Sequence, residues 1–151
     1  MSGRERFRFS VATRVEFSET DAAGILYYGR WSQHVDRAIW GYRRALGIEP
    51  LGPAGHRFVV RSYRSVFHGS ARLEDELEVF TRVSRIGRTS HTMEIRIERA
   101  AGGGGAPAHV FDAEIVLVGL DDYGDAPRAT AIPDDLRARI EAHEGDALER
   151  V

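Results

Sequence analysis

Residues 15–47 read VEFSETDAAGILYYGRWSQHVDRAIWGYRRALG, and this stretch determines how the rest of the chain can fold. In its second half, apolar residues recur at steps of three and four, which predicts an amphipathic α-helix over 27–46. Its apolar positions are Trp31, Val35, Ala38, Ile39, Tyr42 and Leu46. Gly47 follows where helices commonly end. This long apolar stripe, together with Trp40, must be buried against something large.

An acid stands in the first half of the same stretch. Asp21 precedes Gly24 by three residues, where strand-like sequence gives way to the helix. A helix N-terminus offers free N–H groups and the positive end of the helix dipole, both of which bind developing negative charge. We therefore predict a carboxylate that acts as base or nucleophile beside an oxyanion site. Taken alone, an Asp before a helix is more often an N-cap.

The remaining sequence is typical of strands joined by turns. The odd positions of 7–17 predict a strand with one buried face. These positions are Phe7, Phe9, Val11, Val15 and Phe17. Extended segments are also predicted over 58–67, 77–83, 89–99 and 108–120, with loops or turns at 49–55, 86–88, 102–105 and 121–124. A short helix is predicted with Pro133 at its first position and Leu136 and Ile140 on one side.

These elements define a fold class. Short connections favour antiparallel neighbours, because parallel strands need long crossovers. One apolar helix beside alternating strands predicts an α+β fold, with a curled antiparallel sheet wrapped around one long central helix. The length fits a single domain over 1–151. A single layer leaves open sheet edges, so we expect a homodimer or homotetramer.

Composition excludes several classes of function. The chain has no cysteine, which excludes disulfides, thiol nucleophiles and cysteine metal sites. The net charge of −2 argues against a nucleic-acid partner. We find neither a signal peptide nor a membrane span, and therefore expect a cytoplasmic protein with no membrane partner. The six histidines show no ligand spacing, so no metal is expected.

Residues 17–28, FSETDAAGILYY, carry a resemblance to a known family. The order is an acid, any residue, Asp, two small residues, Gly, two apolar residues and an aromatic pair, followed by Trp31 on the helix. This order resembles that of the 4-hydroxybenzoyl-CoA thioesterase family of hotdog-fold acyl-CoA thioesterases. Weaker likeness extends through VDRAIWGYRRALGI, RSVFHGSARLEDELEV, IGRTS and RATAIPDDL. The resemblance implies a hotdog fold, hydrolysis of an acyl-CoA or acyl-carrier-protein thioester, and no cofactor beyond the CoA of the substrate.

The resemblance also implies roles for individual residues. Asp21 matches the catalytic carboxylate, Tyr28 the residue whose backbone N–H polarises the thioester carbonyl, and Gly24 the glycine that lets the backbone approach the substrate. Residues in the positions that hold the CoA nucleotide are Arg88, Ser90 and Arg128. Further substrate-side candidates are Trp31, Asp36 and Glu78, the last of which stands where the aryl-CoA enzyme carries a threonine.

Three alternatives stay open. Asp36 is a rival catalytic acid, because another branch of hotdog thioesterases carries its carboxylate on the helix. A hotdog dehydratase or hydratase would need a histidine paired with an acid, but His34 and Asp36 point about 200° apart on a helix. A non-catalytic acyl-thioester binding module is the third alternative, and the presence of Asp21 argues against it.

Overall fold

The computed structural model describes residues 3–49, 57–102, 106–121 and 124–151. The helices are α1 (Trp31–Ala45) and α2 (Asp134–Glu144), with short 3-10 turns at Arg4–Arg6, Phe17–Glu19, Tyr28–Arg30 and Gly145–Ala147. The strands are β1 (Phe9–Arg14), β2 (Arg57–Phe67), β3 (Glu76–Ile86), β4 (Ser90–Arg99), β5 (Ala108–Leu120) and β6 (Glu149–Arg150). None of the helices in these ranges is long and apolar enough to cross a membrane.

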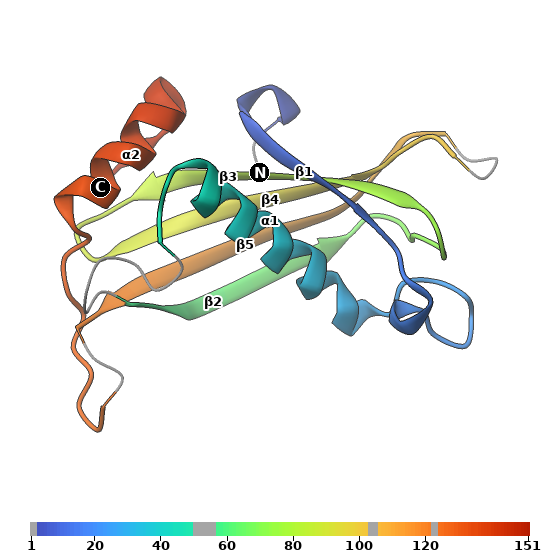
Figure 1. The fold of residues 1–151 in the computed structure, drawn as a ribbon, viewed down its shortest axis with the longest axis horizontal. Coiled ribbons are helices and arrows are strands. Elements are labelled where there is room, and N and C mark those ends of the chain that lie inside the picture. Colours follow the sequence, from blue (N-terminus) through green and yellow to red (C-terminus); the bar gives the residue numbers. More distant parts are fainter. Residues whose placement is uncertain (1–2, 50–56, 103–105, 122–123) are drawn as a thin grey trace.

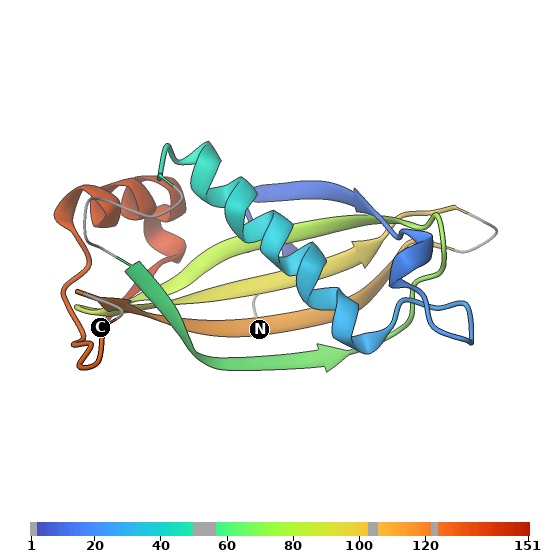
Figure 2. The same ribbon diagram turned by 60° about the horizontal axis from the view of Figure 1, so that its bottom comes forward.

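One curled sheet carries the fold. Its strand order is β1-β3-β4-β5-β2, with antiparallel pairing throughout, and the short β6 pairs with β3 in parallel. Helix α1 runs across one face of this sheet, and α2 lies at one end of it (Figure 1, Figure 2). The predicted hotdog fold, an antiparallel sheet curled around one long helix, is confirmed.

Alternation along the strands separates core from surface. On β3, Leu77 and Val79 are buried in the core beneath α1, while Glu78 between them points to the opposite face. From α1, Trp31 stacks on Phe111 of β5 with ring centroids 5.0 Å apart and ring planes at 11°. The apolar face of the helix thus meets the inner face of the sheet, as the periodicity predicts.

Two aromatic residues depart from the prediction. Phe17 was expected on the buried face of the first strand, but it is 78% exposed. The strand ends at Arg14, and a 3-10 turn at Phe17–Glu19 breaks the period of two. Trp40 is 37% exposed rather than buried, and the guanidinium carbon of Arg43 lies 5.0 Å from the centroid of its ring.

Several boundaries also differ. Helix α1 begins at Trp31 rather than Tyr27, because Tyr28–Arg30 form a 3-10 turn. Pro133 is the N-cap of α2 rather than its first residue, although Leu136 and Ile140 are buried as predicted. Strand β6 has no sequence signal. The predicted loops at 49–55 and 102–105 and the turn at 121–124 lie partly outside the described residues.

Candidate active site

Asp21 lies in a tight loop between the first strand and α1. An antiparallel bridge joins Thr20 and Leu26 at its base. Within the loop, the N–H of Asp21 donates to the carbonyl of Ile25 at 2.9 Å, and the N–H of Gly24 donates to the carbonyl of Asp21 at 3.0 Å. Gly24 adopts a φ of +74°, a conformation that favours glycine. The loop therefore favours glycine at position 24, and it uses both backbone polar groups of Asp21.

The Asp21 carboxylate is exposed, and only one of its two oxygens accepts hydrogen bonds from the described residues. Oδ1 accepts hydrogen bonds from the N–H groups of Ala23 at 2.8 Å and Ile25 at 3.4 Å. Among the described residues, no hydrogen bond or ion pair uses Oδ2. The N-cap positions of the following 3-10 turn and of α1 are Tyr27 and Arg30, so Asp21 caps its own loop and not a helix.

Backbone N–H groups that have no hydrogen-bond partner among the described residues follow directly after this loop. The N–H of Tyr27 donates to the carbonyl of Glu19 at 2.9 Å, and the N–H of Arg30 donates to the carbonyl of Tyr27 at 2.8 Å. Because Arg30 makes the first hydrogen bond of the 3-10 turn, the N–H groups of Tyr28 and Gly29 lie outside the intrahelical pattern. One short segment therefore carries both a carboxylate and N–H donors of the kind an oxyanion needs.

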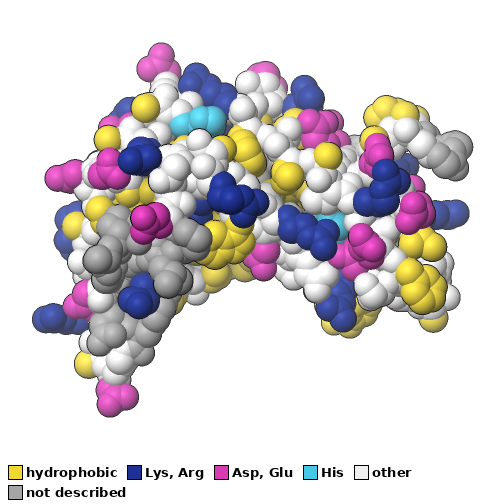
Figure 3. All heavy atoms as spheres, in the orientation of Figure 1, with side chains coloured by type: hydrophobic (Ala, Val, Ile, Leu, Met, Phe, Trp, Pro, Cys, Tyr) yellow, Lys and Arg dark blue, Asp and Glu magenta, His cyan; other side chains and the backbone are white. Residues whose placement is uncertain are grey.

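Two aromatic side chains lie on the surface of this segment. The side chains of Tyr27 and Tyr28 are exposed, and their ring centroids are 4.6 Å apart. Over 17–28, at the right-hand end of the molecule in Figure 3, hydrophobic side chains gather among charged ones.

Two buried side chains, Glu19 and His34, pack beside the base of the Asp21 loop. Nε2 of His34 lies 3.3 Å from Oε2 of Glu19, and Nδ1 of His34 is hydrogen-bonded to Oγ1 of Thr13 at 2.8 Å. Glu19 Oε2 also accepts the N–H of Glu16 at 2.8 Å. Burial lowers the pKa of His34, and the Glu19 carboxylate opposes this with a smaller effect. The sequence interpretation missed this pair because it compared His34 only with Asp36.

Trp31 and Asp36 lie on different sides of α1. Trp31 is buried between β2 and β5, with its ring centroid 6.0 Å from that of Phe67. Asp36 is on the surface, and partial burial raises the pKa of its carboxyl. Burial, followed by the charge of Asp36, also raises the pKa of Tyr63 on β2 to about 12. Asp36 therefore faces the β2 side of the molecule.

Glu78 lies on the sheet face that points away from α1. Its Oε1 accepts a hydrogen bond from Oγ of Ser10 at 2.9 Å. Because its neighbours Leu77 and Val79 are buried on the other face, the sheet separates Glu78 from Trp31. The structure does not bring these two substrate-side candidates together.

The candidates for CoA binding gather at the end of the sheet beside α2. Arg88 lies in the β3–β4 turn, and its carbonyl accepts the N–H of Ile132 at 2.8 Å. Ser90 begins β4 and is paired with Val118 of β5. Arg128 is exposed, with Nε 3.2 Å from Oδ2 of Asp121. The structure thus places these three residues at one end of the sheet, and their role in binding CoA stays a prediction.

Asp21 is at the opposite end of the same sheet. Its loop is tied to the β2–β3 connection by a 2.7 Å hydrogen bond from the N–H of Leu26 to the carbonyl of Ala71. Strand β5 runs the length of the sheet between the two ends, and its 13 residues span roughly 40 Å at ~3.3 Å per residue. Within one chain, the structure therefore does not bring Asp21 together with Arg88, Ser90 or Arg128 (Figure 1).

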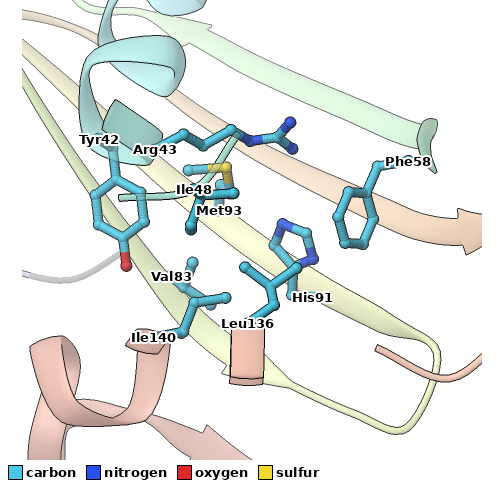
Figure 4. A pocket seen from close by; sticks show the side chains of 9 residues that line it. All are labelled: Tyr42, Arg43, Ile48, Phe58, Val83, His91, Met93, Leu136 and Ile140. Atoms are coloured by element: carbon cyan, nitrogen blue, oxygen red, sulfur yellow. The ribbon is translucent and has the colours of Figure 1, made fainter. Parts of the chain in front are cut away.

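An apolar pocket lies at the C-terminal end of α1 (Figure 4). Its lining residues are Tyr42, Arg43, Ile48, Phe58, Val83, His91, Met93, Leu136 and Ile140. The Tyr42 hydroxyl donates to Oε1 of the buried Glu144 at 2.7 Å. The pocket is remote from Asp21, because the Asp21 loop precedes the other end of this helix.

Comparison with known proteins places these observations in a family. The sequence profile of the Thioesterase superfamily matches residues 23–106. The acyl-CoA thioester hydrolase YbgC of Escherichia coli O157:H7 is 30% identical over 125 residues, which are 82% of this chain and 88% of that protein.

Solved structures agree in fold. The 4-hydroxybenzoyl-CoA thioesterase of Pseudomonas sp. strain CBS-3 has a TM-score of 0.79 and 24% identity, covering 87% of this chain and 97% of the other. A thioesterase of Thermus thermophilus, solved in complex with coenzyme A and Zn, has a TM-score of 0.74 and 26% identity, covering 93% of this chain and 97% of the other.

Proposed function

The chain belongs to the thioesterase superfamily, and we propose that it hydrolyses the thioester bond of an acyl-CoA with the Asp21 carboxylate. The observation that carries this proposal is the segment 21–30, in which a carboxylate with one unengaged oxygen among the described residues precedes free N–H groups. The relationship to YbgC, an acyl-CoA thioester hydrolase, supports the substrate class.

In the proposed reaction, the N–H of Tyr28 donates to the thioester carbonyl oxygen as that oxygen gains negative charge. Asp21 either attacks the carbonyl carbon, giving a mixed anhydride that water hydrolyses, or takes a proton from the water that attacks. In both routes the C–S bond breaks, the thiolate leaves, and the acyl group becomes a carboxylate. Gly24 keeps the loop tight and leaves room for the substrate.

A complete site is proposed to need two chains. Strand β2 is an edge of the sheet and exposes Val60, Tyr63, Val66 and Phe67. Two β2 strands that pair antiparallel about a twofold axis would bring the Asp21 end of one copy beside the Arg88 and Arg128 end of the other. This arrangement would allow one CoA to reach both sets of residues, as a homodimer or as part of a homotetramer.

In this proposal Arg88, Ser90 and Arg128 of the second copy hold the CoA nucleotide, since guanidinium and hydroxyl groups donate to phosphate. The exposed Asp121–Arg128 ion pair would open to admit the phosphate. An acyl-carrier protein as the natural carrier would use fewer of these contacts, because it carries the pantetheine arm without the adenine nucleotide.

Release of free thiol from a panel of acyl-CoAs tests the proposal. We expect turnover with at least one aromatic or aliphatic acyl-CoA. Tight binding of acyl-CoA without release of thiol from any acyl-CoA or acyl-carrier protein would identify a binding module and contradict the proposal. Addition of 3-hydroxyacyl-CoAs to the panel detects a dehydratase, because loss of water from them gives an enoyl thioester that is followed by its absorbance.

A further inference from the structure

Three side chains of types that can bind a metal ion meet on the sheet face that points away from α1. Nε2 of His68 lies 2.8 Å from Oδ2 of Asp112, and Nε2 of His109 lies 2.8 Å from Oδ1 of the same carboxylate. The two imidazole centroids are 4.5 Å apart. One ligand atom from each of the three residues lies within 4.8 Å of the others.

The backbone fixes this cluster before any ligand binds. His68 directly follows β2, and its N–H donates to the carbonyl of Val110 on β5 at 2.8 Å. The N–H of Gly69 donates to the same carbonyl at 3.2 Å. His109 and Asp112 flank Val110 on β5, so the three side chains project from two hydrogen-bonded segments. Their relative positions therefore need little reorganisation.

The carboxylate at the centre of the cluster is nearly buried. The side chain of Asp112 is 9% exposed, against 39% for His68 and 27% for His109. Arg96 is the β4 partner of Asp112 in the sheet register, but its Nε donates to Oε1 of Glu98 at 2.8 Å. A shielded carboxylate is costly unless a cation or good donors compensate it, and in this structure the two imidazoles are placed to do so. The exposed edges of the two imidazoles leave a path from solvent.

We propose that His68, His109 and Asp112 bind one divalent first-row transition metal ion, with Zn²⁺ as the type case. Two imidazole nitrogens and one carboxylate oxygen suit such ions, whereas Mg²⁺ and Ca²⁺ favour oxygen ligands. The ion takes Nε2 of each imidazole, whose proton then lies on Nδ1, and one or both Asp112 oxygens. Bonds from these ligands to such an ion are usually about 2.0–2.2 Å long, so the three side chains would turn from their present hydrogen-bonded positions when the ion binds.

The bound ion would fasten the end of β2 to β5. The segment it fixes leads within a few residues to Ala71, whose carbonyl accepts the N–H of Leu26 from the Asp21 loop. The site is thus a structural one beside the loop and takes no part in the proposed hydrolysis. Local spacing gave no signal for it, because 44 positions separate His68 and Asp112.

The test uses the full chain with its purification tag removed and metal stripped. Titration with Co²⁺, followed by visible absorption, should show one ion per chain, and Zn²⁺ should displace it and raise the thermal midpoint. Mg²⁺ should do neither. Loss of a group that only orients a metal ligand typically costs about 10- to 100-fold in metal affinity, so loss of a ligand itself in His68→Gln or His109→Gln should cost more than about 100-fold. His143→Gln, whose ring packs on Tyr42 outside the cluster, should bind like wild type.

Two results would overturn the proposal. One is the absence of Co²⁺ and Zn²⁺ binding by wild type at micromolar concentrations of metal. The other is unchanged affinity in folded His68→Gln and His109→Gln. Imidazole NMR shifts of the wild type on addition of Zn²⁺ give a second measurement that needs no variant: His68 and His109 should respond, and a response confined to other histidines contradicts the site.

Discussion

Nε2 of His34 lies 3.3 Å from Oε2 of Glu19, and the two side chains are 0% and 4% exposed. His34 is on α1 and Glu19 comes two residues before Asp21, so this contact joins the helix to the base of the Asp21 loop. Because burial lowers the pKa of His34, the imidazole is neutral at physiological pH. The loop is therefore supported by a neutral histidine and a buried acid.

This pair gives the stability a defined pH dependence. His34 titrates near 6.5 in the unfolded chain and below that value in the folded protein. Between the two values the unfolded state binds more protons. The His34 contribution to the free energy of unfolding is therefore fully present above pH 6.5 and falls as the pH decreases from 6.5 toward the folded pKa.

Denaturant unfolding at several pH values between about 7 and 5 measures this effect. We expect wild type to lose stability over this range more steeply than His34→Gln, by at most about 1.4 kcal/mol per pH unit for one proton. Parallel curves for the two proteins would show that His34 is not the responsible group.

Glu19→Ala should weaken both the fold and the loop. It leaves the N–H of Glu16 and the ring of His34 without the carboxylate, at a cost of about 1–3 kcal/mol. Because Glu19 supports the loop and does not touch the substrate in the proposed reaction, kcat should fall and Glu19→Gln should largely restore it. Loss of turnover in Glu19→Gln equal to that in Asp21→Asn would instead assign Glu19 a direct chemical role.

The proposed pairing through β2 predicts the effect of charge on that edge. Val60→Lys/Val66→Lys places like charges where two copies would meet, so light scattering should show a shift toward the 16.9 kDa monomer. Activity should fall with it. Leu73→Lys replaces an exposed apolar residue outside β2 and is the matched control. An active wild-type monomer, or a double variant that assembles normally, would contradict this pairing.

Arg128→Ala should weaken the binding of acyl-CoA by about 1.5–3 kcal/mol, the value of a charge-assisted hydrogen bond. Binding of an acyl-pantetheine, which lacks the nucleotide, should be nearly unchanged. Arg14→Ala removes another exposed, ion-paired arginine at the Asp21 end and should affect neither ligand. Equal losses with both ligands would remove Arg128 from the nucleotide site.

The sequence predicts the fold well because its signals are local and periodic. The apolar stripe of α1, the alternation along β3 to β5 and the short β3–β4 turn each depend on neighbouring residues. The prediction that Phe17 is buried was wrong because a 3-10 turn interrupts the strand. That turn is stabilised by the capping interaction between Glu16 and Glu19. The prediction for Trp40 was wrong because Trp40 lies nine residues after Trp31, which places it about 180° from Trp31 around α1 and outside the buried stripe.

The site was only partly predictable. Asp21, Gly24 and Tyr28 form one continuous motif, so their proximity follows from sequence. The Glu19–His34 contact and the His68–His109–Asp112 cluster join residues from different elements. Local sequence spacing therefore does not predict them. The separation of Asp21 from Arg128 likewise depends on the length and direction of the strands.

The turnover of Asp21→Asn is the decisive measurement for the proposed chemistry. Asn keeps an oxygen that can accept the N–H groups of Ala23 and Ile25, so the thermal midpoint should hardly change. It cannot act as nucleophile or base, so kcat should fall by about a hundredfold or more while substrate affinity stays within a few-fold. Retention of more than about a tenth of wild-type turnover by Asp21→Asn, with its loss in Asp36→Asn, would place the catalytic acid on α1 and contradict the proposed role of Asp21.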